Sequence, residues 1–387
     1  IAASGGAGKV VAQWIQDRRP PMDLADVDIR RALPFQSNRR YLHDRTVETL
    51  GLLYAMHWPY YQYQTARGAR RTALHDRLVT AGACMGETAG WERPNWYARG
   101  GVKPEYEYSY GRQNWFPCAD YEAKQLMTNC AFFDQSSFAK YEISGPGAAE
   151  ALEWICAGSV AKQPGRITYT QLLNSRGGIE ADLTVARLSD EHFYIVTGTG
   201  FRTHDLAWIR DHLPAHSQAR LADVTEQWGT LSLMGPLARA ILEAVTTDDV
   251  SNAGFPFGHV RVISIAGVAV RALRITYVGE LGWELHVPLA ETGKVYDALM
   301  AAGAPLGLRP VGYRALESLR LEKGYRAWSS DITPNDTPFE AGLGWAVKMR
   351  ANTPFIGRPA LEAVAAKPLT KRLAGFTIAD PAAVLVG

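Results

Sequence analysis

The sequence predicts an α+β protein in which antiparallel sheets are covered by amphipathic helices. From residue 130 onward, strand-like runs rich in β-branched and aromatic residues alternate with helical patterns. Within this part, residues 141–152 and 231–242 resemble one another, because each reads as a short strand, a Gly-Pro turn and an alanine-rich helix with proline near its first turn. Two such units predict two related α+β lobes packed side by side.

The composition argues against several functional classes. The 387 residues are 47% hydrophobic and 21% charged, which is ordinary for a globular protein of two or three domains. A net charge of +2 gives no electrostatic case for a nucleic-acid or membrane partner, and no apolar run approaches the roughly 20 residues of a spanning helix. The four cysteines lack CxxC spacing and the histidines lack ligand spacing, so we predict no metal site. Reduced thiols are expected, in the cytoplasm or, for a eukaryote, the mitochondrial matrix.

Residues 1–16 predict a glycine turn that leads into a helix. Gly5, Gly6 and Gly8 would let a phosphate or a flavin ring approach the free amides at the helix N-terminus. A plain glycine-rich loop fits the same residues equally well. Arg-Arg-Pro-Pro at 18–21 ends this helix and marks a boundary. Because the chain starts within this segment and stops inside an apolar run, we expect a piece of a longer polypeptide.

Apolar residues at helical spacing predict further helices at 41–56, 74–81, 290–303 and 311–323. Further strands are predicted at 193–197 and 259–276. We expect Thr72 to cap the second of these helices. Four aromatic residues lie between the first two helices, and we interpret them as packing at a domain junction: Trp58, Tyr60, Tyr61 and Tyr63. A stacking platform for nucleic acid would normally carry excess positive charge.

The segment Asn-Ser-Arg-Gly-Gly-Ile-Glu-Ala-Asp-Leu at 174–183 is the most informative part of the chain. Its paired glycines allow backbone angles and close approaches that other residues resist. Asp182 follows four residues after the second glycine, and a β-rich run continues from it. A ligand placed against this main chain would therefore lie beside Asp182. Taken alone, the segment also fits an ordinary hairpin with a solvated aspartate.

Several blocks together resemble the folate-dependent aminomethyltransferases, the T-proteins of the glycine cleavage system. They are Thr-Ala-Leu-His-Asp-Arg-Leu at 72–78, Gly-Trp-Glu-Arg-Pro-Asn-Trp-Tyr at 90–97, Phe-Asp-Gln-Ser-Ser-Phe at 133–138 with Ser-Gly-Pro at 144–146, and Gly-Gly-Ile-Glu-Ala-Asp-Leu at 177–183. Later matches are Gly-Glu-Leu-Gly-Trp-Glu at 279–284, Ser-Leu-Arg-Leu-Glu at 318–322 with Asp-Ile at 331–332, and Leu-Gly-Trp at 343–345 with Phe-Ile-Gly-Arg at 355–358. The blocks keep the family's order.

The segment before residue 72 resembles the flavin-dependent dimethylglycine and sarcosine dehydrogenases. Residues 5–15 are similar to the last FAD-contacting turn and helix of a flavin amine oxidase domain, and residues 20–71 to the connector that follows. The resemblance implies a three-lobed, ring-like T-protein fold and four parts. These are a flavin-domain tail at 1–20, a connector (oxidoreductase central domain) at 21–71, a folate-binding aminomethyltransferase domain at 72–362 and the start of a C-terminal barrel at 363–387.

The resemblance also implies an FAD-dependent enzyme. Oxidation of an N-methylated amine on FAD gives a cationic iminium, and tetrahydrofolate takes up the one-carbon unit as its methylene derivative before formaldehyde is released. The implied partners are thus an N-methylated amine and a folate, with FAD bound mostly outside this chain. Asp182 matches the family's catalytic aspartate, and a carboxylate there can stabilise the cation or move protons. Ala181 stands where many T-proteins carry another aspartate.

Five further residues are candidates for folate contacts. Glu280 is the pterin candidate, because a carboxylate accepts the two adjacent N–H donors of the pterin edge; a solvated turn glutamate is the alternative. Tyr169 would stack on or hydrogen-bond the folate; packing in the core or at the rim is the alternative. Trp345 is interpreted as a wall or core residue. Arg320 and Arg358 would clamp the folate's glutamate carboxylates.

Some alternatives remain open from the sequence. For Arg320, an ion pair with Glu317 or Glu322 fits equally well. For the whole chain, a stand-alone T-protein or folate-dependent demethylase is disfavoured by residues 1–71. A non-catalytic regulatory homologue that uses the fold only to bind a partner is disfavoured by its two site carboxylates.

Overall fold

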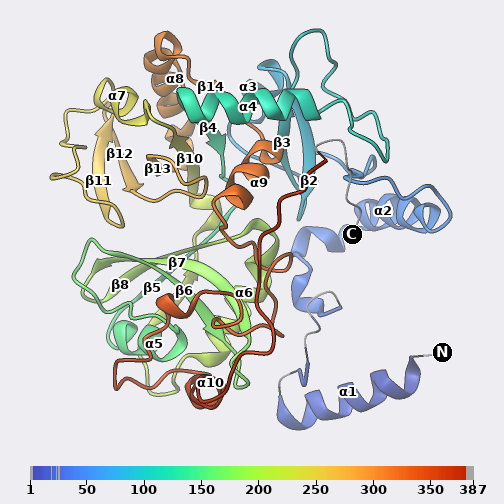
Figure 1. Cartoon of the computed structure of the whole chain (residues 1–387), viewed down its shortest axis with the longest axis vertical. Helices are drawn as coiled ribbons and strands as arrows, with labels where there is room; N and C mark the ends of the chain where they lie inside the picture. Colours follow the sequence, from blue (N-terminus) through green and yellow to red (C-terminus); the bar gives the residue numbers. More distant parts are fainter. Residues whose placement is uncertain (1–2, 19, 23, 25–26, 381–387) are drawn as a thin grey trace.

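The computed structural model describes residues 3–18, 20–22, 24 and 27–380, which fold around three sheets (Figure 1). The helices are α1 Ser4–Asp17, α2 Arg39–Leu52, α3 His75–Thr80, α4 Phe116–Thr128, α5 Ala148–Ile155, α6 Arg202–His212, α7 Ala238–Glu243, α8 Thr292–Gly303, α9 Tyr313–Glu322 and α10 Arg358–Ala365. Short 3-10 helices are η1 Ile29–Arg31, η2 Pro34–Ser37, η3 Thr199–Phe201, η4 Thr225–Gln227, η5 Leu289–Glu291, η6 Ala304–Leu306 and η7 Gly344–Ala346.

Two antiparallel lobes lie one above the other in Figure 1. The five-stranded sheet of the lower lobe has the order β6 Ile167–Leu173, β7 Ile179–Ser189, β8 His192–Thr197, β5 Ala139–Ser144 and β9 Arg220–Asp223. The six-stranded sheet of the upper lobe has the order β11 Val260–Ile265, β12 Val268–Leu273, β13 Gly282–Pro288, β10 Trp228–Met234, β4 Ala131–Asp134 and β14 Arg309–Pro310, with only β14 parallel to its neighbour.

The strand order confirms the internal repeat predicted from the sequence. In each lobe three consecutive antiparallel strands are followed in the sheet by the strand of the repeated unit, β5 below and β10 above. Each of these strands leads through a glycine with positive φ, Gly145 at 100° or Gly235 at 134°, into a helix, α5 or α7. Because glycine reaches such angles without steric cost, the same turn forms in both copies.

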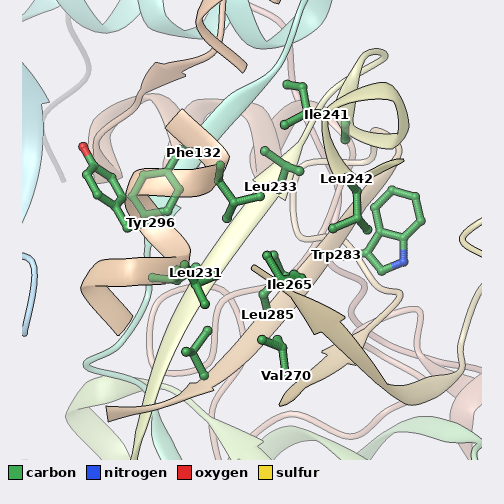
Figure 2. Close-up of a cluster of buried hydrophobic side chains, with 14 of the residues drawn as sticks. Phe132, Leu231, Leu233, Ile241, Leu242, Ile265, Val270, Trp283, Leu285 and Tyr296 are labelled. Carbon is green, nitrogen blue, oxygen red and sulfur yellow. The ribbon is translucent and has the colours of Figure 1, made fainter. Parts of the chain in front are cut away.

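Each lobe has its own hydrophobic core on one face of its sheet. Figure 2 shows the core of the upper lobe, where Leu231 and Leu233 of β10 point to the same side as Trp283 and Leu285 of β13. This follows from the alternation of side chains along a strand. Helices α7 and α8 close this core. In the lower lobe, α5 and α6 cover the corresponding face.

The sheets meet through polar side chains of their other faces. The Tyr194 hydroxyl of β8 lies 2.9 Å from His286 Nδ1 of β13, and Arg271 of β12 donates to Glu142 of β5 at 3.1 Å. All four groups are removed from bulk water to a large extent, so their mutual contacts satisfy them in place of water. These polar contacts lie beside a buried apolar cluster that also joins the two sheets, in which Ile167 and Val196 of the lower lobe pack with Val260 and Leu273 of the upper one.

A third, smaller unit lies beside the upper lobe (Figure 1). Its sheet has the order β1 Arg70–Arg71, β3 Trp91–Tyr97 and β2 Ala83–Thr88, and α4 and α9 pack against β3. Three of the aromatic residues predicted to pack at a junction do so here: Trp58 against Tyr110, Tyr60 against Trp115, and Tyr61 against Tyr108. Their partners all belong to the loop that follows β3 and leads to α4.

Two local predictions differ from the structure. Thr72 does not cap α3, because its hydroxyl donates instead to Asp134 at 2.6 Å. The glycine turn predicted before the first helix is wrong, since all three glycines lie inside α1. The boundary expected between residues 362 and 363 falls inside α10. A barrel beginning there stays a prediction, of which positions 381–387 lie outside the described residues.

Candidate functional site

The β6–β7 hairpin carries Asp182, and its turn is built by Asn174. The Asn174 Oδ1 atom accepts hydrogen bonds from the amides of Arg176 at 2.9 Å and Gly178 at 3.0 Å. Gly177 has φ 83°, and a Cβ on Gly178 would lie 1.9 Å from the carbonyl oxygen of Pro334. The close approach that the glycine pair permits is therefore made by the protein's own backbone. Asn174 inside the turn and Pro334 outside it therefore hold the hairpin in place four residues before Asp182.

Asp182 is held by two side chains of the neighbouring strand β6. It is paired in register with Gln171, whose Nε2 donates to Asp182 Oδ1 at 2.9 Å. The Tyr169 hydroxyl also hydrogen-bonds the carboxylate. Tyr169 and Gln171 point to the same face because they are two residues apart on the strand. Of these two, the sequence identified Tyr169 but missed Gln171, which the period-two spacing from Tyr169 would have indicated.

The carboxyl group of Asp182 ionises at a higher pH than that of an ordinary aspartate. Asp182 is partly exposed, yet the protein surrounds its carboxyl closely enough that burial raises its pKa to about 6. The hydrogen bonds from Gln171 and Tyr169 act in the opposite direction, the nearby negative charge of Asp205 adds to the rise, and the positive charge of Arg326 lowers it. A group with this pKa exchanges its proton close to neutral pH, as general acid–base catalysis requires.

We expect Asp182→Asn to stabilise the protein at pH 8 but not at pH 4. An unfolded aspartate has a pKa of about 3.9, against about 6 in the folded chain, so the folded state binds more protons between these values. The native carboxylate is therefore destabilising above pH 6, and this penalty disappears as the pH falls below 4. Urea unfolding should show a gain of roughly 1–3 kcal/mol at pH 8.

The exposed Asp190, on the turn after β7, provides the matched control. Asp190→Asn should change the free energy of unfolding little at either pH, since its carboxyl is mostly in water. An equal effect of Asp182→Asn at pH 4 and pH 8 would show that its carboxyl titrates normally.

An aromatic wall stands next to Asp182. The ring of Tyr169 stacks on that of Trp345 in η7, with centroids 5.7 Å apart and an angle of 26° between the planes. Trp345 is 74% exposed, which is unusual for tryptophan. From the upper lobe, Tyr277 lies close enough for the Asp182 charge to contribute to the rise of its pKa, and it stacks on Tyr325 at 6.0 Å. Flat, exposed rings beside an ionisable carboxyl can hold a flat polar ligand.

Glu280 lies in the connection between β12 and β13, three residues after Tyr277. Its side chain is partly exposed, and Oε1 is 3.5 Å from Lys323 Nζ at the end of α9. The loop is pressed onto that helix, because a Cβ on Gly279 would meet the Lys323 side chain at 2.4 Å. Glu280 thus presents a carboxylate from the upper lobe, whereas Asp182 belongs to the lower one. Pterin contact by Glu280 stays a prediction.

The two predicted arginine clamps are engaged within the protein. Arg320 is 3% exposed and forms ion pairs with Glu317 and Asp331. Of the readings left open by the sequence, the structure shows the pair with Glu317 and adds Asp331. Arg358 starts α10, where it pairs with Glu362 at 2.8 Å and donates to backbone carbonyl groups of residues 349–353. Neither guanidinium group is brought to Asp182 by a contact in the described part of the chain.

The glycines proposed to approach a flavin lie in the first two turns of α1. A Cβ on Gly5, Gly6 or Gly8 would meet no atom within 4 Å, and no described residue of α1 is buried. Val11 and Ile15 are 51% and 75% exposed. These residues alone supply no enclosed site for FAD, so we derive no step through it.

Other classes of site find no support in residues 3–18, 20–22, 24 and 27–380. No cluster there contains three histidine, cysteine, aspartate or glutamate residues able to hold a metal ion. Within the same residues, no helix combines the length and apolar character needed to cross a membrane. All four cysteines are buried and free, and burial raises the pKa of each thiol.

Comparison with protein families gives two matches. Residues 74–351 match the GCVT N-terminal domain, and residues 19–72 match the FAD dependent oxidoreductase central domain. The first range contains Asp182, Tyr169, Glu280 and Trp345. The second contains α2 and the aromatic residues that pack against the loop after β3.

Similar proteins extend beyond this chain. A 4-methylaminobutanoate oxidase (formaldehyde-forming) of Paenarthrobacter nicotinovorans is 39% identical over 386 residues, which are 100% of this chain and 47% of that protein. Mitochondrial sarcosine dehydrogenase of Homo sapiens is 38% identical over 97% of this chain and 45% of its own length. The chain thus spans about half the length of the curated relatives it matches. The structure of glycine cleavage system aminomethyltransferase T from Bartonella henselae is similar with a TM-score of 0.63 and 27% identity, covering 77% of this chain and 76% of that one.

Proposed function

The chain belongs to the aminomethyltransferase family of the GCVT N-terminal domain and has the T-protein fold, and from this premise we propose that it binds a reduced folate and transfers a one-carbon unit to it. We propose further that it serves an FAD-dependent dehydrogenase or oxidase of N-methylated amino acids. The observation that carries the proposal is the grouping of Asp182, Tyr169 and Trp345, in which a proton-exchanging carboxyl adjoins an exposed aromatic wall.

The residues around Asp182 fit a folate better than a purely apolar ligand. The exposed face of Trp345 offers a surface on which a flat ring can stack, and Glu280 offers a carboxylate for paired N–H donors. When bound, tetrahydrofolate would supply the amine nitrogens that take up the one-carbon unit as the methylene derivative. The oxidation step and FAD are assigned to a part of the relatives that this chain does not span.

In the transfer step, Asp182 would stabilise positive charge and move a proton. Gln171 donates to Oδ1 and Tyr169 also hydrogen-bonds the carboxylate, so Asp182 would be held in one orientation toward a reacting nitrogen. At pH 7 a carboxyl with a pKa of about 6 is mostly ionised, so it attracts a cationic one-carbon donor. It can then take up a proton released from the nitrogen, because its proton affinity lies near the ambient pH. Tyr169 keeps the carboxylate oriented through both states.

The choice of an N-methylated amino acid follows the names of the relatives. Sarcosine and 4-methylaminobutanoate both carry an N-methyl group and a carboxylate. Residues 19–72 support a link to an oxidoreductase, because they match a domain of FAD dependent oxidoreductases. A cytoplasmic or mitochondrial-matrix location is part of the same proposal, as both settings leave the thiols reduced.

Titration of the chain with tetrahydrofolate and with FAD tests the proposal. We expect saturable binding of one tetrahydrofolate, with a change in tryptophan fluorescence, and no retention of FAD through gel filtration. Trp345→Phe should remove most of the fluorescence change while equilibrium dialysis still detects binding, because phenylalanine preserves a stacking surface. An unchanged fluorescence response in this variant would place the folate away from η7. Absence of tetrahydrofolate binding to the wild type would contradict the proposed function.

A further inference from the structure

Arg93 is a partly exposed arginine without a carboxylate partner. It lies on β3 and faces α9, with its Cζ atom 3.9 Å from the centroid of the Tyr313 ring. Its Nε atom is buried and has no hydrogen-bond partner. Burial lowers the pKa of Arg93, which shows that the protein withdraws water from this cation. A desolvated cation is costly unless an anion compensates it.

The arginines around Arg93 are treated differently by the fold. Glu92, the neighbour of Arg93 on β3, pairs with Arg67, and Glu87 of β2 pairs with Arg45 of α2. Arg320 of α9 pairs with Glu317 and Asp331. Within the described part of the chain, no carboxylate oxygen lies within 4.0 Å of the guanidinium nitrogens of Arg93, the distance that defines an ion pair. The protein therefore gives comparable cations a carboxylate partner, whereas Arg93 has a hydrogen bond with Tyr313 and only a more distant attraction to Glu317.

The local charge is positive as a result. Arg314, nearly two turns before Arg320 on α9, repels the charge of Arg93, and its own donors go to the uncharged Tyr106 hydroxyl at 3.2 and 3.1 Å. Of the charges that act on Arg93, Arg314 repels it and Glu317 attracts it, and Glu317 is already paired with Arg320.

Arg93 is also linked to the surroundings of Asp182. The negative charge of Glu317 contributes to the pKa shifts of both Arg93 and Tyr277, and the charge of Asp182 also contributes to that of Tyr277. On the other side, Tyr313 hydrogen-bonds Ser137, whose Oγ lies 2.8 Å from Thr199 Oγ1 at the start of η3. Phe201, at the end of η3, packs in the same cluster as Tyr169. A chain of contacts therefore runs from Arg93 through Tyr313 and Ser137 to η3.

We propose that Arg93 binds a carboxylate of a molecule taking part in the one-carbon transfer. This inference rests on the proposed function, since both ligands of that reaction carry a carboxylate: the N-methylated amino acid and the glutamyl tail of the folate. Guanidinium groups match carboxylates with two parallel donors, and the stack on Tyr313 holds the plane of the guanidinium in place. The terminal nitrogens of Arg93 would supply the two donors.

Calorimetric titrations of Arg93→Gln test the inference. The matched control is Arg99→Gln, because Arg99 also lies over a tyrosine ring, Tyr121 at 3.4 Å, but is exposed. The probes are tetrahydrofolate, tetrahydropteroate (which lacks the glutamyl tail), and sarcosine with its carboxylate-free analogue dimethylamine, added to the folate-loaded chain. We expect Arg93→Gln to weaken one carboxylate probe by about 10- to 100-fold and Arg99→Gln to change none by more than about twofold.

The pairs of probes distinguish the two sources of the carboxylate. If Arg93 holds the glutamyl tail, Arg93→Gln binds tetrahydrofolate more weakly than the wild type does, and its affinity for tetrahydropteroate is unchanged. If it holds the carboxylate of the amino acid, Arg93→Gln binds sarcosine more weakly, while its affinities for dimethylamine and for both folates are unchanged. Arg93→Lys keeps the charge but loses the paired donors, and it should retain part of the affinity provided that circular dichroism shows a native fold.

The inference is overturned if folded Arg93→Gln or Arg93→Lys binds every carboxylate probe as the wild type does. Failure of the proposed function looks different, because the wild type would then not bind tetrahydrofolate at all. In that case the sarcosine and dimethylamine pair, titrated without folate, still decides whether Arg93 binds a carboxylate.

Discussion

Asp182→Asn is expected to slow the transfer of the one-carbon unit by about 10²- to 10⁴-fold, the usual contribution of a positioned acid–base group. Asparagine keeps the size of the side chain and can still accept from Gln171, whose Nε2 lies 2.9 Å away. It can neither carry a negative charge nor exchange a proton near pH 6. Folate affinity should change much less than the rate, because the loss concerns a charge that matters most in the transition state.

The measurement is a steady-state assay of the complete protein with an N-methylated amino acid and tetrahydrofolate. Methylene-folate, free formaldehyde and reduction of the electron acceptor are followed separately. Amine oxidation should continue while formaldehyde replaces methylene-folate, since capture no longer competes with hydrolysis. Gln171→Leu should act in the same direction more weakly, because it removes the group that orients the carboxylate without removing the carboxylate. A wild-type yield of methylene-folate from Asp182→Asn would exclude Asp182 from the mechanism.

Glu280→Gln is expected to weaken tetrahydrofolate binding by roughly 10- to 100-fold. The amide replaces a carboxylate that can accept two N–H donors with one acceptor and one donor, so one pterin donor would face another donor. Loss of a charge-assisted hydrogen bond costs about 1.5–3 kcal/mol. Glu280 is partly exposed and its contact with Lys323 is long at 3.5 Å, so the substitution should leave the fold intact.

Glu322→Gln is the matched control for this titration. Glu322 is exposed at the end of α9, next to the lysine that faces Glu280, so it has the same charge in the same neighbourhood. Its replacement should change the affinity by less than about twofold. Equal affinities of the two variants for tetrahydrofolate would show that the pterin lies elsewhere.

The sequence predicted those features that depend on neighbours along the chain. Strand and helix periodicity located both lobes, and the similarity of two Gly-Pro units revealed their common plan. Tyr169 and Asp182 are joined by a single hairpin, so pairing of adjacent strands brings them together. The family resemblance added the T-protein fold, which the solved aminomethyltransferase structure confirms.

Features that depend on distant parts of the chain were beyond the sequence. Thr72 is a good capping residue by type, but a buried carboxylate 62 positions away takes its hydroxyl. The folate clamp inferred for Arg320 could not anticipate that the chain returns after α9 to place Asp331 against it. Gly178 looked suited to ligand contact, yet the carbonyl of Pro334 fills the space. In each case a residue distant in the sequence contacts the group that the local sequence alone leaves available for a cap or a ligand.

The two lobes share a strand order but differ in the turn of their first hairpin. In the upper lobe the first hairpin is closed by two residues, Ala266 and Gly267, both with positive φ, which is the tightest way to reverse a strand. The corresponding hairpin below is opened to hold Asn174 and the glycine pair. The same strand order therefore carries a two-residue turn in one lobe and a longer turn close to Asp182 in the other. Exchanging the two hairpins would test whether the sheet of the upper lobe can also hold the longer turn.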